Sequence, residues 1–205
     1  MKYDLTAKVF YITFSKMFKK FYHLNYPNID SKSILKKTKL EYKNMILRTP
    51  GLAKGNYLEP NLIIACFIFS LAKNDSNMNP EIMDSFIAYC LSTKLMKNIN
   101  LSKKNKGTIF NVKEQDKRVE DGIKSQSSKY EMDWIFDYTK GNNEFWCKYT
   151  KCGICTLAKK ENMEEYISCL CKMDYKNFKL MGGNLTRTKT LANGDDCCDF
   201  HVTRM

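Results

Sequence analysis

Arginine is scarce in this 205-residue chain, and the scarcity weighs against nucleic-acid recognition despite a formal net charge of +12. Lysine outnumbers arginine by 30 to 4, whereas proteins that read bases and phosphates favour the forked guanidinium group. The charge is also uneven, because residues 1–58 hold 12 basic and 3 acidic side chains, whereas residues 129–205 hold 12 and 11. We therefore expect ordinary solvated surface and no nucleic-acid partner, with a basic nucleic-acid or membrane-surface protein as the alternative.

Long apolar runs are also lacking. The longest, residues 62–72, is interrupted by Ser70 and is too short to span a bilayer. The first residues include Lys2 and Asp4 and lack the apolar stretch of a secretory signal. We therefore expect no integral membrane association and a cytoplasmic location. In that reducing compartment the cysteines would be free thiols, metal ligands or catalytic groups.

The first part of the chain has apolar residues at helical spacing. The aromatic stripe of residues 5–24 should face the core, although its lysines also suit a helix at a membrane surface. Pro60 and Pro80 suit first helical turns, and Asn79 suits a helix cap. Helices are expected over residues 5–24 and 31–47, from residues 59 and 79 onward, and over residues 112–127, with a loop over residues 99–111.

The apolar period changes from helical to alternating near residue 132, which indicates strands. Two hairpins are expected, with Asn193-Gly194 at the tight turn of the second and two short helices between them. The sequence therefore predicts an α+β fold, in which an N-terminal helical layer packs on a C-terminal four-stranded antiparallel sheet with short inserted helices. We expect a single domain, residues 1–205, with a mainly helical part (1–128) and a cysteine-rich α+β part (129–205). The strands are expected over residues 132–138, 144–150, 185–191 and 197–204.

Seven of the nine cysteines lie in the last third of the chain. Cys66 and Cys90 lie in apolar helices and Cys147 in a strand, where each is expected to be a small buried hydrophobe. Cys152 and Cys155 have the spacing of half a zinc site or of a redox pair.

A complete metal site would need further ligands. Together with Cys171 and either Asp174 or Cys198, the pair Cys152 and Cys155 could bind zinc or another divalent metal. The second half lacks the spacing that makes zinc sites recognisable, so we assign no metal with confidence.

The terminal strand sorts its side chains onto two faces. Cys198 and Phe200 are expected on the core side, and Asp199 and His201 on a face that could line a cleft. Asp199 beside His201 would form a general-base pair there, although their spacing alone favours an Asp and a His on an exposed strand face.

A second candidate pair of functional residues lies on a predicted helix. Cys171 and Asp174 are three residues apart, so they should project from one side of that helix. A thiol and a carboxylate on one helical face can line a pocket or bind a metal.

Three stretches together resemble the L-2-amino-thiazoline-4-carboxylic acid hydrolase family. The resemblance covers mainly residues 130–205. Enzymes that gave the family its name open a cyclic amidine ring to a carbamoyl-cysteine on the way to L-cysteine. The three stretches are Thr150-Lys-Cys152-Gly-Ile-Cys155, Cys171-Lys-Met-Asp174-Tyr175, and Leu185-Thr-Arg187-Thr188-Lys-Thr190 followed by Leu-Ala-Asn-Gly194-Asp-Asp-Cys-Cys198-Asp199-Phe200.

The resemblance implies a small-molecule substrate, a bacterial character and three catalytic residues. Cys171 would be a covalent nucleophile or would help to activate water, with or without a metal. Asp174 and Asp199 would transfer protons or bind the exocyclic amine.

The resemblance also implies which residues bind the substrate. Arg187 would hold the substrate carboxylate in a bidentate fashion, Cys198 would form the pocket floor, and Thr188 and His201 would complete the site. The alternative is a non-catalytic small-molecule or zinc-binding module of the same fold. Oligomeric state does not follow from the sequence.

Overall fold

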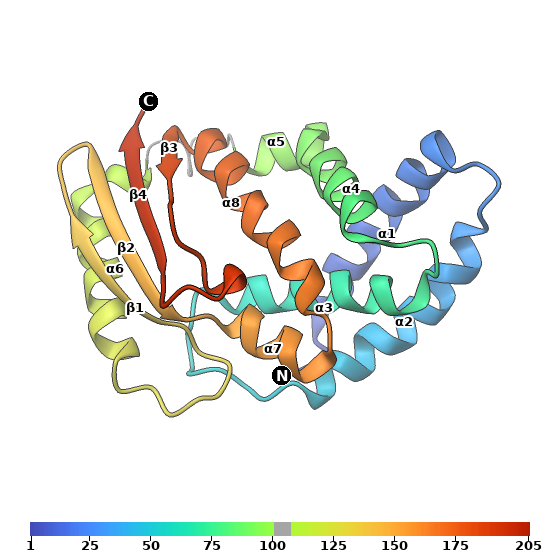
Figure 1. The fold of residues 1–205 in the computed structure, drawn as a ribbon, viewed down its shortest axis with the longest axis horizontal. Coiled ribbons are helices and arrows are strands. Elements are labelled where there is room, and N and C mark those ends of the chain that lie inside the picture. Colours follow the sequence, from blue (N-terminus) through green and yellow to red (C-terminus); the bar gives the residue numbers. More distant parts are fainter. Residues whose placement is uncertain (101–107) are drawn as a thin grey trace.

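The predicted α+β class is confirmed by a computed structural model, which describes residues 1–100 and 108–205 (Figure 1). Most helices precede the sheet in the chain. The helices are α1 (Leu5–Asn25), α2 (Ser31–Arg48), α3 (Glu59–Asn74), α4 (Pro80–Ser92), α5 (Lys94–Asn100), α6 (Val112–Ser125), α7 (Gly153–Glu161) and α8 (Ile167–Leu180). The antiparallel strands are β1 (Ile135–Lys140), β2 (Glu144–Lys151), β3 (Gly183–Thr186) and β4 (Cys198–Arg204), in the order β1-β2-β4-β3.

Side-chain caps explain where several helices begin. Asp4, Asp30 and Asn79 accept hydrogen bonds from backbone N–H groups in the first turns of α1, α2 and α4. These N–H groups have no partner inside a helix, so a capping oxygen stabilises the start. Pro60 and Pro80 occupy first-turn positions of α3 and α4. The predicted starts are therefore confirmed to within a residue or two.

The aromatic stripe of α1 lies in the helical core. Phe14 packs on Phe67 of α3 with 5.6 Å between ring centroids, and Phe18 packs edge-on against Phe86 of α4 at 5.5 Å. Ring pairs at such distances are stabilising beyond the area they bury. Because the stripe is covered in this way, it is not available to a membrane surface. Among the described residues, no helix combines the length and apolar character needed to cross a membrane.

Three cysteines are buried in the apolar core, as expected. Cys66 is 0% exposed, Cys90 3% and Cys147 5%. Burial disfavours the thiolate and raises the pKa of Cys66 and Cys147 to about 12. They behave as small hydrophobic side chains.

The loop predicted over residues 99–111 lies largely outside the described part of the chain, because residues 101–107 are not described. On one side α5 extends to Asn100, so the helical structure continues further than expected. On the other side Thr108–Phe110 forms a single 3-10 turn that leads into the predicted polar helix, α6.

The second hairpin departs from the prediction. Its first strand, β3, ends at Thr186 rather than at residue 191, and residues 187–197 form a bent connection with a 3-10 turn at Leu191–Asn193. Gly194 follows with φ 88°, the left-handed conformation that glycine adopts readily. The connection leaves the ladder where the Asp199 side chain accepts hydrogen bonds from the backbone N–H groups of Thr188 and Lys189.

The sheet has two different faces. Cys147 and Phe200 are paired across β2 and β4 and face the interior, towards α8, which lies against β3. Trp146 and His201 are also paired, stack at 4.7 Å and face outward, and Trp146 is 41% exposed. The sheet and α6 occupy one end of the molecule in Figure 1, and α3 and α8 run between this end and helices α1, α2 and α4. The interior face of the sheet and these two helices enclose the site described below.

Candidate functional site

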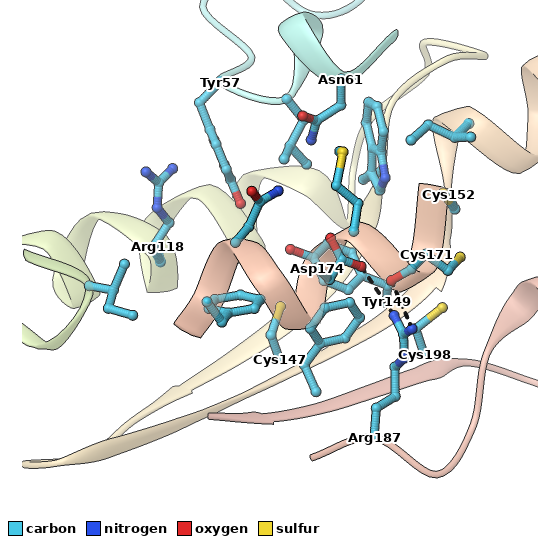
Figure 2. A pocket seen from close by; sticks show the side chains of 18 of the residues that line it. Tyr57, Asn61, Arg118, Cys147, Tyr149, Cys152, Cys171, Asp174, Arg187 and Cys198 are labelled. Carbon is cyan, nitrogen blue, oxygen red and sulfur yellow. Dashed lines mark hydrogen bonds and ion pairs between the residues drawn. The ribbon is translucent and has the colours of Figure 1, made fainter. Parts of the chain in front are cut away.

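A cavity of about 470 Å³ lies between the interior face of β2 and β4, α8, the start of α3 and α6 (Figure 2). A volume in this range fits a small-molecule site. Most of its lining is apolar or aromatic, and a few polar and charged groups project into it. Asp174 and Arg187 form the charged centre, and Cys152, Cys171 and Cys198 lie on the same side.

Arg187 is held in place by both ends of its guanidinium group. Nη1 donates to Oδ2 of Asp174 at 3.2 Å, and Nη2 donates to the backbone oxygen of Cys171 at 3.1 Å. The carbon of the guanidinium lies 4.9 Å from the ring centroid of Phe200 and 5.2 Å from that of Tyr175, so aromatic faces flank the cation.

One nitrogen of this buried group has no partner. The Arg187 side chain is only 4% exposed, and its Nε makes no hydrogen bond in the described structure. Leaving a buried charged donor unsatisfied is costly, and such exceptions call for an explanation.

The carboxyl group of Asp174 is partly buried and lines the cavity. Its side chain retains 33% exposure, and that surface faces the cavity that the residue lines. Burial raises the pKa of the Asp174 carboxyl to about 6, although the charge and hydrogen bond of Arg187 oppose the rise. A carboxyl group with this pKa can accept and return a proton near neutral pH.

Cys171 and Asp174 both line the cavity, as their spacing on α8 predicts. Burial, and then the Asp174 carboxylate, raise the pKa of the Cys171 thiol to about 12. The resting thiol is therefore neutral rather than an activated thiolate.

Two further cysteines line the same wall. The pKa of Cys152 is raised by a side-chain hydrogen bond to Cys155 and by burial. Burial likewise raises the pKa of Cys198, whose sulfur accepts a 3.2 Å hydrogen bond from the backbone N–H of Leu191. These thiols form a neutral, polarisable wall beside Arg187.

The structure does not bring Thr188, Asp199 and His201 into this group. None of them is among the described residues that line the cavity. The cleft lies on the Cys198 and Phe200 face of β4, which corrects the expectation that the Asp199 and His201 face would line it. The reason is tertiary, because α8 and α3 cover the first face and leave the other to solvent.

Asp199 and His201 also do not pair with each other. Asp199 accepts hydrogen bonds from the N–H of Thr188 at 3.0 Å, from the Thr188 hydroxyl at 2.6 Å and from the N–H of Lys189. His201 instead lies 2.9 Å, Nε2 to Oε2, from Glu144. Asp199 therefore fixes the backbone directly after Arg187.

Sequence reasoning missed three further lining residues, Tyr57 and Arg118 at the opposite end of the cavity and Tyr149 beside Asp174 (Figure 2). The guanidinium carbon of Arg118 is 3.6 Å from the ring centroid of Tyr57, and Glu114 and Asp121 bind its nitrogens. Burial raises the pKa of Tyr57 to about 12. The alternation of the second predicted strand offered a clue for Tyr149, which shares a face with Cys147. Tyr57 and Arg118 belong to no motif.

The proposed metal ligands are only partly gathered. Cys152, Cys171 and Cys198 line the cavity, whereas Cys155 is not among the described lining residues. Over residues 1–100 and 108–205, no group of three or more His, Cys, Asp or Glu side chains is arranged to hold a metal ion.

Comparisons with known proteins identify a family. A search among curated proteins found no match. One solved structure, an Fe(II) unliganded H-NOX protein mutant from K. algicida, aligns over 93% of this chain and 96% of its own at 12% identity, with a TM-score of 0.31. A likeness at that level carries no inference. The family profile described as L-2-amino-thiazoline-4-carboxylic acid hydrolase matches residues 61–202, which include the cavity residues Asp174 and Arg187. The chain therefore belongs to the L-2-amino-thiazoline-4-carboxylic acid hydrolase family.

Proposed function

We propose that the protein hydrolyses a cyclic amidine that carries a carboxylate, such as L-2-amino-thiazoline-4-carboxylic acid, to a carbamoyl-cysteine. The observation that carries the proposal is the pair of Arg187 and Asp174 at the cavity wall. Family membership supports the class of substrate.

Arg187 is the proposed anchor for the substrate carboxylate. A remaining N–H of its terminal nitrogens would donate to one carboxylate oxygen, while Asp174 and the backbone of Cys171 keep the guanidinium in a fixed orientation. A preorganised donor loses little conformational freedom when the ligand binds, so it gains affinity and orientation.

Asp174 is the proposed general base and acid. It takes a proton from water as the water oxygen bonds to the amidine carbon, which lies between the ring sulfur and the ring nitrogen. Collapse of the tetrahedral intermediate breaks the ring bond from that carbon to sulfur or to nitrogen, and Asp174 returns the proton to the departing atom. The proton of the added hydroxyl group passes to the ring nitrogen as the carbonyl forms. One water is added overall, and the carboxyl pKa of about 6 suits both transfers.

Cys171 remains the second candidate for the attacking group. With a pKa of about 12 its thiol would have to lose its proton to Asp174 before bonding to the amidine carbon. Direct attack by water needs neither a thiolate nor a second step to release a covalent intermediate, so we propose water as the attacking group.

The test is turnover of L-2-amino-thiazoline-4-carboxylic acid, followed by mass spectrometry of the carbamoyl-cysteine product. We expect Asp174→Asn to lower kcat by about a hundredfold or more, the usual contribution of a positioned acid or base. Asp116→Asn is the matched control, because that carboxylate pairs with Lys140 on the exposed surface. Wild-type turnover by Asp174→Asn would contradict the mechanism. Binding without any turnover by the native protein would instead support the non-catalytic alternative.

A further inference from the structure

A second cavity, of about 460 Å³, adjoins the candidate site. We call it the apolar chamber, lined by α1, α3, α4, α5 and α8. The two cavities share a stretch of wall on α3 and α8. The residues that line both are Asn61, Ile64, Leu170, Met173, Asn177 and Met181.

The apolar chamber differs sharply in chemistry from the candidate site. None of the described residues that line the apolar chamber carries a charge. Outside the wall shared with the candidate site, Thr13 contributes a polar side chain, and aromatic and aliphatic groups such as Phe14, Ile68 and Phe86 surround it. Protein interiors are otherwise close-packed, with few voids larger than a water molecule. A space of this size lined by hydrocarbon is suited to hold hydrocarbon.

The shared wall carries two amide side chains. Neither Asn61 nor Asn177 donates or accepts a side-chain hydrogen bond with another described residue. Both lie where the charged cavity meets the apolar chamber, and the amide of Asn61 is visible at the cavity wall in Figure 2. A ligand crossing from one space to the other would meet two hydrogen-bonding groups on its way.

We propose that the ligand is amphipathic, with a polar head at Arg187 and Asp174 and an apolar alkyl or aryl arm that passes Asn61 and Asn177 into the apolar chamber. The placement of the head group depends on the proposed function. The apolar arm narrows the expected substrates to amidine carboxylates with an apolar substituent. The small thiazoline named by the family has no such arm and would use the first cavity alone.

The size of the expected effect follows from the hydrophobic contribution of each methylene. Moving one methylene from water into an apolar space strengthens binding about fourfold. Simple alkanoates therefore make suitable probes, because their carboxylate can bind Arg187, their chain can enter the apolar chamber, and they are not hydrolysed.

The test is calorimetric titration of the full chain with butanoate, hexanoate and octanoate. We expect affinity to rise about fourfold per methylene in the native protein. Thr13→Trp, which fills the apolar chamber from α1, should abolish the dependence on chain length and leave butanoate affinity unchanged. Thr13→Val is the matched control, and Met96→Phe is a second filling variant from α5. Melting temperatures establish that each variant is folded.

Affinity that does not depend on chain length in the native protein, or length dependence that survives both filling variants, would overturn the proposal. Turnover of the small thiazoline and of a derivative with an alkyl substituent separates this inference from the proposed function. Length-dependent binding without turnover of either compound supports the apolar chamber and contradicts the hydrolase. Turnover without length dependence does the reverse.

Discussion

Asp174 of α8 and Arg187, the residue directly after β3, meet at 3.2 Å, Oδ2 to Nη1, on the inner side of the sheet. Arg187 follows Leu185 on this face by strand alternation, and Asp199 accepts three hydrogen bonds from the next two residues, Thr188 and Lys189. The outer face of the sheet thus fixes the backbone that delivers Arg187 to the inner face. Asp199 is accordingly a positioning residue in our proposal rather than part of the catalytic set.

Asp199→Ala tests this positioning role. It removes the oxygen that accepts from the backbone N–H groups of Thr188 and Lys189 and the second oxygen that accepts from the Thr188 hydroxyl. Hydrogen bonds to a charged group contribute roughly 1.5–3 kcal/mol, so we expect the KM for the thiazoline to rise about tenfold or more. kcat should change little. Asp196→Asn, which removes only an exposed pair with Lys189, is the control. A fall in kcat at constant KM would point to a chemical role instead.

The pH dependence of turnover tests Asp174 as the base. Its pKa is raised from 3.8 to about 6, so the carboxylate needed for proton abstraction is lost as the pH falls through 6. kcat/KM should therefore rise tenfold per pH unit below about 6 and level off above it. A Cys171 thiolate with a pKa of about 12 would make the rate climb throughout the alkaline range. A profile without a plateau above pH 6 would count against Asp174.

Cys171→Ala separates the two nucleophiles directly. If water attacks, the alanine variant keeps turnover within about tenfold of the native value, because only the cavity wall changes. If the thiol attacks, turnover falls by several orders of magnitude. Cys90→Ala, a cysteine of the apolar chamber, controls for the loss of a buried thiol. Mass spectrometry of quenched reactions should find no covalent adduct on Cys171.

The sequence predicted those features of the fold that depend on interactions between neighbouring residues. Asn79 and Pro80 mark the start of α4 through a hydrogen bond and a fixed φ, both set by neighbouring residues. Cys171 and Asp174 share a cavity because helical geometry puts residues three apart on one side.

The predictions that were wrong or missing concern contacts between segments that are distant in the sequence. Alternation along β4 separates Cys198 from Asp199 but cannot say which face α3 and α8 will cover. Arg118 reaches the cavity from α6 and Tyr57 from the segment before α3, and no spacing in the sequence links them. The early end of β3 has the same origin, since Asp199 competes with the sheet for the backbone of the following residues.

Glu161 of α7 connects the cysteine-rich part to the helical part, which gives a prediction for stability. Its carboxylate accepts hydrogen bonds from Arg48 at 2.7 and 2.6 Å and from Lys73 at 2.6 Å, and its side chain is 9% exposed. We expect Glu161→Gln to lower the free energy of unfolding by roughly 1–3 kcal/mol, since it leaves two partly buried cations short of a counter-charge. Glu120→Gln, from an exposed pair with Lys124, should cost less than about 0.5 kcal/mol.

The pH dependence of that difference follows from the sign of the pKa shift. The hydrogen bond with Arg48, aided by Lys73, lowers the pKa of Glu161 below its ordinary 4.5, although burial opposes the shift. The stabilisation is therefore fully present above pH 4.5 and is lost as the pH falls through the folded-state value. Denaturant unfolding at pH 7 and at about pH 3 should show the gap between native protein and Glu161→Gln closing in acid. A gap of equal size at both pH values would mean that Glu161 contributes through packing, because only the charged form can lose its stabilising effect on protonation.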